Sequence, residues 1–177
     1  HEALLFYIMG DKFENDKEMF PLVDEKGNII GAASRAECHD GSKKLHPVVH
    51  LHIFNSKGEL LLQKRPNWKK IQPDKWDTAV GGHVDLGENI SQALKRETME
   101  EEGITEYIPE FITSYVFESK VEKELVFVYK TIYDGEIHPS KDELATARFW
   151  NENEIKNNVG KNVFTPNFEQ ELNRIKL

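Results

Sequence analysis

The chain has 177 residues, of which 38% are hydrophobic and 31% are charged, and its formal net charge at pH 7 is −8. This length suits one domain with a substantial core, so we expect a single domain over residues 1–177, with residues 1–18 as an N-terminal extension. The negative charge argues against a nucleic-acid polymer or an anionic membrane as partner. It leaves room for a small phosphorylated substrate, because a bound metal reverses the local field.

Two further features bear on cellular location. The apolar run over residues 4–9 is too short to span a bilayer and lacks the basic flank of a signal peptide. Cys38 is the single cysteine, which excludes an internal disulfide and suits a reducing compartment. We therefore expect a cytoplasmic protein that makes no membrane contact.

Hydrophobic alternation and turn residues predict more strands than helices. In chain order, the predicted strands cover residues 20–23, 28–32, 48–54, 60–63, 76–80, 111–117, 125–133 and 147–150. The predicted helices are a short one opened by the capping box Ser34–Glu37, a long one over about 89–102, one capped by Asn151 or Asn153, and one opened by Thr165–Pro166. Many strands with few helices, one of them in mid-sequence, predict an α/β fold with a mixed sheet sandwiched by helices.

The long predicted helix carries acids where a helix is normally apolar. At 100° per residue, the stripe begun by hydrophobic residues continues into three glutamates, and its members are Ile90, Ala93, Leu94, Glu97, Glu100 and Glu101. Acids at these spacings repel one another and lie near the negative end of the helix dipole. A hard divalent cation such as Mg²⁺ would relieve this repulsion. The alternative is a solvated acidic face, but the acids fall on the apolar stripe and not opposite it.

The residues around this helix support a binding site. Gly81–Gly82 follows a strand-like run, so we expect a sharp turn there at which the backbone can approach a ligand. Asn89 is suited to cap the helix and Gly103 to end it. Arg96 lies one turn before Glu100 and can hold a carboxylate in a fixed orientation.

At these positions the chain resembles the Nudix box, which fixes glycines and charged residues at set spacings. The matching residues are Gly82, Glu88, Arg96, Glu97, Glu100, Glu101, Gly103 and Ile104. The one departure is Thr98, where the family usually has an aliphatic residue and which we expect at the edge of the stripe. The resemblance implies one Nudix-like domain with an α/β/α sandwich and a mixed sheet.

The same resemblance implies a hydrolase that acts on a phosphoanhydride bond in a nucleoside diphosphate–X or a related small diphosphate. The resemblance implies that Mg²⁺ or Mn²⁺ is held by Glu97, Glu100 and Glu101. Arg96 would orient a carboxylate, and Glu88 would stabilise the loop before the helix. The general base would be one of the three, with Glu97 preferred, or an acid from a later loop, for which Glu143 is the candidate by position. Many members are dimers, so a homodimer is among the expected assemblies.

Substrate contacts are expected from Arg65 and from the backbone at Gly81 and Gly82. The surrounding loop is rich in lysine and tryptophan, which suit phosphates and rings, whereas Trp76 is expected to pack. His50 and His52 share one face of a predicted strand. A role as simple packing or surface residues is sufficient to explain both.

A second set of residues is unexpected in a plain Nudix hydrolase, namely His39, His46, His83, Glu122 and Glu124. It resembles the metal centre of type 1 isopentenyl diphosphate isomerase, a Nudix-fold enzyme that binds metal through three histidines and two glutamates. Imidazole and carboxylate together favour Zn²⁺ or Mn²⁺. The alternative is that His46 and His83 satisfy hydrogen bonds in the core.

Three functions therefore stay open. A metal-dependent diphosphate hydrolase is favoured by the complete acidic box. In the isomerase a catalytic cysteine precedes the Gly-His pair, but Gly81 stands at that position, which weighs against an isomerase-like enzyme. The third is a non-catalytic Nudix module that binds a metabolite, for which all three box glutamates would be unnecessary.

Overall fold

The structure is a computed structural model that describes residues 16–142 and 146–175. The run 4–9, most of the expected N-terminal extension and Glu143 lie outside these residues. The strands are β1 (Met19–Val23), β2 (Ile29–Ser34), β3 (Leu45–Phe54), β4 (Leu60–Lys64), β5 (Trp76–Thr78), β6 (Val80–His83), β7 (Glu110–Glu118), β8 (Lys123–Ile132) and β9 (Thr146–Trp150). The helices are α2 (Arg35–Cys38), α3 (Ile90–Glu102), α4 (Glu152–Asn158), α5 (Pro166–Glu171) and the 3₁₀ helix η1 (Leu172–Arg174).

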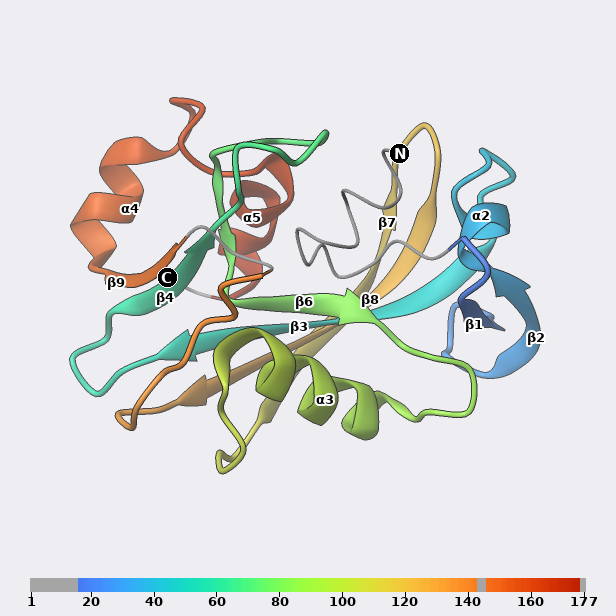
Figure 1. Ribbon diagram of the computed structural model, residues 1–177, viewed down its shortest axis with the longest axis horizontal. Helices are drawn as coiled ribbons and strands as arrows, with labels where there is room; N and C mark the ends of the chain where they lie inside the picture. The colour runs from blue at the N-terminus through green and yellow to red at the C-terminus, as the bar shows by residue number, and fades with distance from the viewer. Residues whose placement is uncertain (1–15, 143–145, 176–177) are drawn as a thin grey trace.

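The main sheet is mixed, as predicted. Its strands follow the order β5-β4-β3-β8-β7, with β6 also paired to β3 and β9 to β4. β3 and β8 run parallel, whereas the other pairings are antiparallel. Figure 1 shows α3 on one side of this sheet and α4 and α5 on the other, while β1 and β2 form a small separate sheet beside α2. The α/β/α arrangement is therefore confirmed, and among the described helices none is long and apolar enough to cross a membrane.

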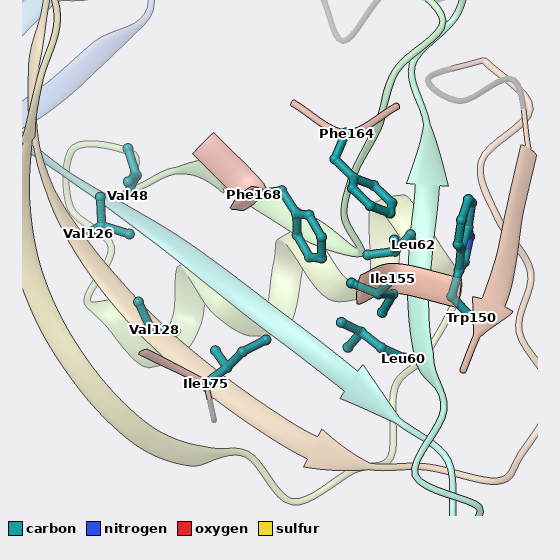
Figure 2. Close-up of a cluster of buried hydrophobic side chains, with 10 residues drawn as sticks. All are labelled: Val48, Leu60, Leu62, Val126, Val128, Trp150, Ile155, Phe164, Phe168 and Ile175. Atoms are coloured by element: carbon teal, nitrogen blue, oxygen red, sulfur yellow. The ribbon is translucent and has the colours of Figure 1, made fainter. Parts of the chain in front are cut away.

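The central strand β3 divides the core in two. Its odd-numbered residues Val49, Leu51 and Ile53 pack in the cluster that contains Leu94 of α3. Its even-numbered face contributes Val48 to a second cluster beneath α4 and α5. Figure 2 shows this second cluster, whose residues are Val48, Leu60, Leu62, Val126, Val128, Trp150, Ile155, Phe164, Phe168 and Ile175. Because neighbouring side chains of a strand point to opposite faces, β3 supports both layers at once.

The predicted helix starts are confirmed by their hydrogen bonds. Capping boxes begin three helices, formed by Ser34 with Glu37, Asn89 with Gln92, and Asn151 with Glu154. Asn151, and not Asn153, is thus the cap of α4. Thr165 caps α5 with Pro166 at the first position, and Gly103 ends α3 with a φ of 66°.

Two expectations about the glycine-rich segment and the helix are wrong. Gly81 and Gly82 do not form a sharp turn; they lie within β6, where they pair with His50 and Val49 of β3. Thr98 does not lie at the edge of the stripe. Thr98 is fully buried, and local hydrogen bonds make this burial possible. The Thr98 hydroxyl donates to the Leu94 carbonyl at 2.7 Å and accepts from the Tyr107 hydroxyl at 3.1 Å.

Candidate active site and metal centre

The acids of α3 face the sheet. Glu97 is 1% exposed and Glu101 is 6% exposed, whereas the side chain of Glu100 is about one-third exposed. The solvated-face alternative is therefore wrong for Glu97 and Glu101. Carboxylates are rarely buried unless charged or hydrogen-bonding groups accompany them, so the surroundings of these two residues identify the site.

Arg96 lies beside two acids of the stripe, whereas the third is held by other donors. The Glu97 carboxylate is paired with the guanidinium of Arg96. Glu101 accepts hydrogen bonds from the Gly81 N–H at 3.2 Å and from the Gln63 amide at 3.3 Å. Glu100 lies 3.5 Å from Arg96. Glu97 and Glu101 thus face β6, at Gly82 and Gly81 respectively.

Arg96 ties the helix to the preceding loop. It donates two hydrogen bonds to the Glu88 carboxylate, at 2.8 and 2.9 Å, and one to the His83 carbonyl at 3.1 Å. Glu88 also accepts from the Asp85 N–H at 2.9 Å. A two-pronged guanidinium–carboxylate bond fixes orientation as well as distance. Arg96 is therefore placed to orient Glu97, and Glu88 to stabilise the loop.

A pocket of about 300 Å³ opens where β6, β3 and α3 meet. Its lining combines acids with bases, and includes Glu97, Glu124, His50, His83, Arg65 and Lys69, together with Gly81 and Gly82. A larger depression of about 1340 Å³ lies elsewhere, around Phe54 and Ile108, and none of the expected site residues lines it. We take the smaller pocket as the candidate active site, because acidic and basic side chains line it together.

Arg65 is fixed in this pocket wall. Its Nε donates to the Ile71 carbonyl at 3.0 Å, and the guanidinium lies 3.8 Å from Asp77. Trp76 packs edge-on against Trp150 at 5.1 Å between ring centres, which fits the packing role expected for it. Arg65, Gly81 and Gly82 thus line the same pocket, and their contact with a substrate stays a prediction.

The histidine and glutamate set also assembles. Ligand atoms of His39, His46 and His83 lie within 4.8 Å of one another, as do those of His46, Glu122 and Glu124. His39 Nε2 is 2.7 Å from Glu122, and both His46 Nε2 and His83 Nε2 are within 4 Å of Glu124. Residues of β3, β6 and β8 are therefore gathered at one place with His39, which follows α2, and Glu122, which precedes β8.

Hydrogen bonds orient two of these rings toward the cluster. His39 Nδ1 donates to the Arg35 carbonyl at 2.8 Å and His46 Nδ1 donates to the Lys44 carbonyl at 2.9 Å, so in both rings Nε2 faces inward. Histidine ligands of metals are commonly oriented in this way. His46 Nε2 is buried with no hydrogen-bond partner within the described part of the chain. A cation fits this donor set.

Electrostatics at the cluster point the same way. Burial, together with the neighbouring Glu122, raises the pKa of Glu124 to about 7. Burial also lowers the pKa of His46, which favours a neutral imidazole. A neutral imidazole is the form that binds metals. A cation at the cluster would offset the raised pKa of Glu124 and would further favour the neutral imidazole of His46.

The acids of α3 are less tightly gathered than the histidine cluster. Within residues 16–142 and 146–175, they do not form a group whose oxygens all lie within 4.8 Å. The donors remain of the type that Mg²⁺ prefers, since all are carboxylate oxygens and two are buried. Both donor sets therefore fit a metal, and the softer imidazole-containing set fits Zn²⁺ or Mn²⁺.

Three residues of the pocket region were not predicted to act together. His50 and His52 each bond to Glu171, a carboxylate with 0% exposure at the end of α5. The alternation of His50 and His52 along β3 was the available signal, but the sequence alone does not show that Glu171, 119 positions after His52, reaches them. Neither histidine is a simple packing or surface residue.

Comparisons with known proteins agree with the fold. A model of the NUDIX domain family matches residues 44–168. An uncharacterised Nudix hydrolase of Listeria monocytogenes is 35% identical over 153 residues, which cover 85% of this chain and 90% of that protein. An isopentenyl-diphosphate Delta-isomerase of Mycolicibacterium vanbaalenii is 32% identical over 134 residues, covering 72% and 74%. A solved structure from Deinococcus radiodurans superposes with a TM-score of 0.75 at 20% identity, over 89% of this chain and 98% of that one.

A mixed sheet between helices, with an acidic helix at the mouth of a pocket, defines an α/β enzyme of the Nudix fold. The chain belongs to the Nudix family, as a Nudix hydrolase whose relatives include isomerase-like members.

Proposed function

We propose that this Nudix hydrolase cleaves a phosphoanhydride bond in a nucleoside diphosphate–X or a related small diphosphate, with Mg²⁺ or Mn²⁺ as cofactor. One observation carries the proposal. The buried carboxylate of Glu97 lies against Gly82 in the wall of a pocket that Arg65 and Lys69 also line. Ligands for a cation and positive groups for phosphates thus share one cavity.

In this proposal each residue has a chemical task. Glu97, Glu100 and Glu101 would hold the ion, which supplies charge neutralisation at phosphate oxygens and a more acidic water. Arg96 keeps Glu97 oriented, and Glu97 takes the proton of the attacking water. Arg65 binds phosphate oxygens with its fixed guanidinium. The backbone of Gly81 and Gly82 lets the substrate approach closely.

We further propose a second metal centre at the five-residue cluster, whose ligands are His39, His46, His83, Glu122 and Glu124. Its support is the inward orientation of Nε2 in His39 and His46, and the buried Nε2 of His46, which has no hydrogen-bond partner among the residues that the structure describes. Zn²⁺ or Mn²⁺ suits these ligands better than Mg²⁺. The centre adjoins the proposed active site, because His83 and Glu124 line the same pocket.

An isomerase-like activity has less support. Gly81 offers no thiol where the isomerase has its cysteine. Cys38 does not replace it: the thiol is fully buried beside Phe20 and Ala33, does not line the pocket, and has its pKa raised to about 11 by burial. A non-catalytic module has less support still, because burying Glu97 and Glu101 is costly without a cation-dependent role.

The experiment is a panel of nucleotide and isoprenoid diphosphates incubated with Mg²⁺, with release of phosphate or nucleoside monophosphate as the readout. We expect turnover of at least one compound, a loss of at least about 100-fold in Glu101→Gln, and no loss in the exposed control Glu110→Gln. Isomerised isoprenoid diphosphate without hydrolysis would favour the isomerase-like alternative. Binding without either reaction would favour the non-catalytic module.

We also propose that residues 1–177 form a single Nudix-like domain. The expected homodimer stays a prediction, and sedimentation equilibrium of the purified chain tests it.

A further inference from the structure

A buried carboxylate joins β3 to α5 beside the pocket. Glu171, the last residue of α5, is 0% exposed and accepts hydrogen bonds from three side chains. His50 Nδ1 lies 3.0 Å from each carboxylate oxygen, His52 Nε2 lies 2.8 Å from Oε2, and the Tyr115 hydroxyl donates to Oε1 at 3.0 Å. The charge is thus fully satisfied by side chains from two strands.

This bonding fixes which nitrogen of His50 faces the pocket. A carboxylate only accepts hydrogen bonds, so the hydrogen on Nδ1 points to Glu171. The other nitrogen, Nε2, is directed toward Gly81, 3.7 Å from the place that a β-carbon there would occupy. Across the described residues, Nε2 has no hydrogen-bond partner, and the side chain of His50 is 18% exposed and lines the pocket.

The charges around His50 favour its protonated form. Burial opposes protonation, but Glu171 outweighs burial and raises the pKa of His50 to about 9, with smaller contributions from Glu124 and Asp77. Burial alone would raise the pKa of Glu171. His50 and His52 outweigh burial and hold this pKa well below its usual range. At neutral pH, Nε2 therefore carries a hydrogen that it can donate into the pocket.

A purely structural role accounts for only part of this arrangement. His52 is completely buried and serves to anchor Glu171 within the core. His50 is different, because one nitrogen is held by Glu171 while the other opens on the cavity. A histidine oriented by a carboxylate, with its second nitrogen facing a cavity, is the usual arrangement of an imidazole that acts on a ligand.

We propose, on the basis of the function proposed above, that His50 contacts the diphosphate of the substrate through Nε2–H and that Glu171 is its positioning residue. The contact adds a further positive donor to those of Arg35, Arg65 and Lys69, which line the same pocket. It lies at Gly81, where the absence of a side chain leaves room for a phosphate oxygen. His50 acts by hydrogen bonding and electrostatic attraction and binds no metal in this assignment.

The test measures binding of methylene diphosphonate to the metal-free protein in EDTA by isothermal titration calorimetry. Loss of a hydrogen bond to an anion weakens binding, so we expect a dissociation constant about tenfold higher in His50→Phe. His50→Gln retains a donor and should lose less. The exposed control His138→Phe should bind as the wild type does. Mn²⁺ affinity should be the same in His50→Phe and the wild type.

The positioning role has its own readout. Glu171→Gln removes the charge that orients His50, so the ¹⁵N resonances of the His50 ring at pH 7 should shift toward the neutral form, and probe binding should weaken as in His50→Phe. A merely structural Glu171 would leave those resonances unchanged in the folded variant. If Glu171→Gln does not fold, the two His50 variants still decide the contact.

The outcomes separate this inference from the proposed function. Equal probe affinity in folded His50→Phe and wild type overturns the inference, even if diphosphate hydrolysis is intact. Weaker probe binding in His50→Phe, with no hydrolysis by the wild type of any compound in the panel, supports the contact and rejects the hydrolase. Altered Mn²⁺ affinity in His50→Phe would assign the ring to a metal and overturn the inference.

Discussion

Gly82 of β6 and Glu97 of α3 approach so closely that a β-carbon at position 82 would overlap the Glu97 carboxylate. The glycine is therefore required by the acid and not by a turn, since residue 82 lies within a paired strand. This relationship joins the first glycine of the Nudix-like motif to the helix of the motif. It also places the first buried carboxylate of the helix at the pocket wall.

Substitution Gly82→Ala should displace the Glu97 carboxylate while leaving the sheet intact. We expect activity to fall by about 100-fold or more, because a misplaced catalytic carboxylate is ineffective, with a loss of stability of about 1–3 kcal/mol. Steady-state kinetics and urea unfolding measure the two effects. The matched control is Gly31→Ala in β2, whose new β-carbon would meet Leu22 at an ordinary 3.7 Å. Equal activity in both variants would contradict the account.

The bond between Arg96 and Glu88 should be worth a measurable coupling energy. Arg96→Lys loses the two-pronged geometry, and we expect about 1–3 kcal/mol of destabilisation, since both side chains are largely shielded from water. A double-mutant cycle with Glu88→Gln, followed by urea unfolding, measures the coupling. Strictly additive losses would mean that the two residues act independently.

Stability should depend on pH through His50. Its pKa is raised from 6.5 to about 9 in the folded protein, so its stabilising contribution is complete below pH 6.5 and is lost as the pH rises through 9. Between these values the wild type should lose up to about 3 kcal/mol more than His50→Phe does. Chemical denaturation at several pH values gives the difference. Parallel curves for the two proteins would exclude the Glu171–His50 pairing.

The cluster beneath α4 and α5 should dominate the stability of that layer. Phe168 is 0% exposed within it, so Phe168→Ala should cost about 3–5 kcal/mol of unfolding free energy. Phe111 is 53% exposed on β7, and Phe111→Ala serves as the control with a loss below about 1 kcal/mol. Thermal and urea unfolding of both variants provide the comparison. Similar losses would contradict the core assignment.

Much of the fold follows from local signals in the sequence. The capping residues Ser34, Asn89 and Thr165 correctly predicted the starts of three helices, because each cap hydrogen bond joins residues three positions apart. Hydrophobic alternation predicted the strands, because it too depends on residues close together in the sequence. The acidic stripe also indicated correctly that acids lie on the inward face of the helix, since Glu97 and Glu101 are buried.

The remainder depends on contacts between distant segments. Gly81 and Gly82 suggested a turn, and only the approach of α3 explains why glycine lies within a strand. Thr98 suggested an edge position, whereas its hydroxyl bonds within the helix and to Tyr107. The pairing of His50 with Glu171 joins positions 121 residues apart, which no local pattern encodes.

We propose that the acids of α3 hold a divalent ion at the substrate pocket. Electron paramagnetic resonance of Mn²⁺, titrated into the protein with methylene diphosphonate present, measures this directly. The variant His46→Gln removes one ligand of the proposed second centre, so that the ion it still binds reports mainly on the acidic helix. We predict that His46→Gln binds Mn²⁺ and that adding Glu101→Gln weakens this binding by at least about tenfold. Equal Mn²⁺ affinity in the single and double variants would contradict the account.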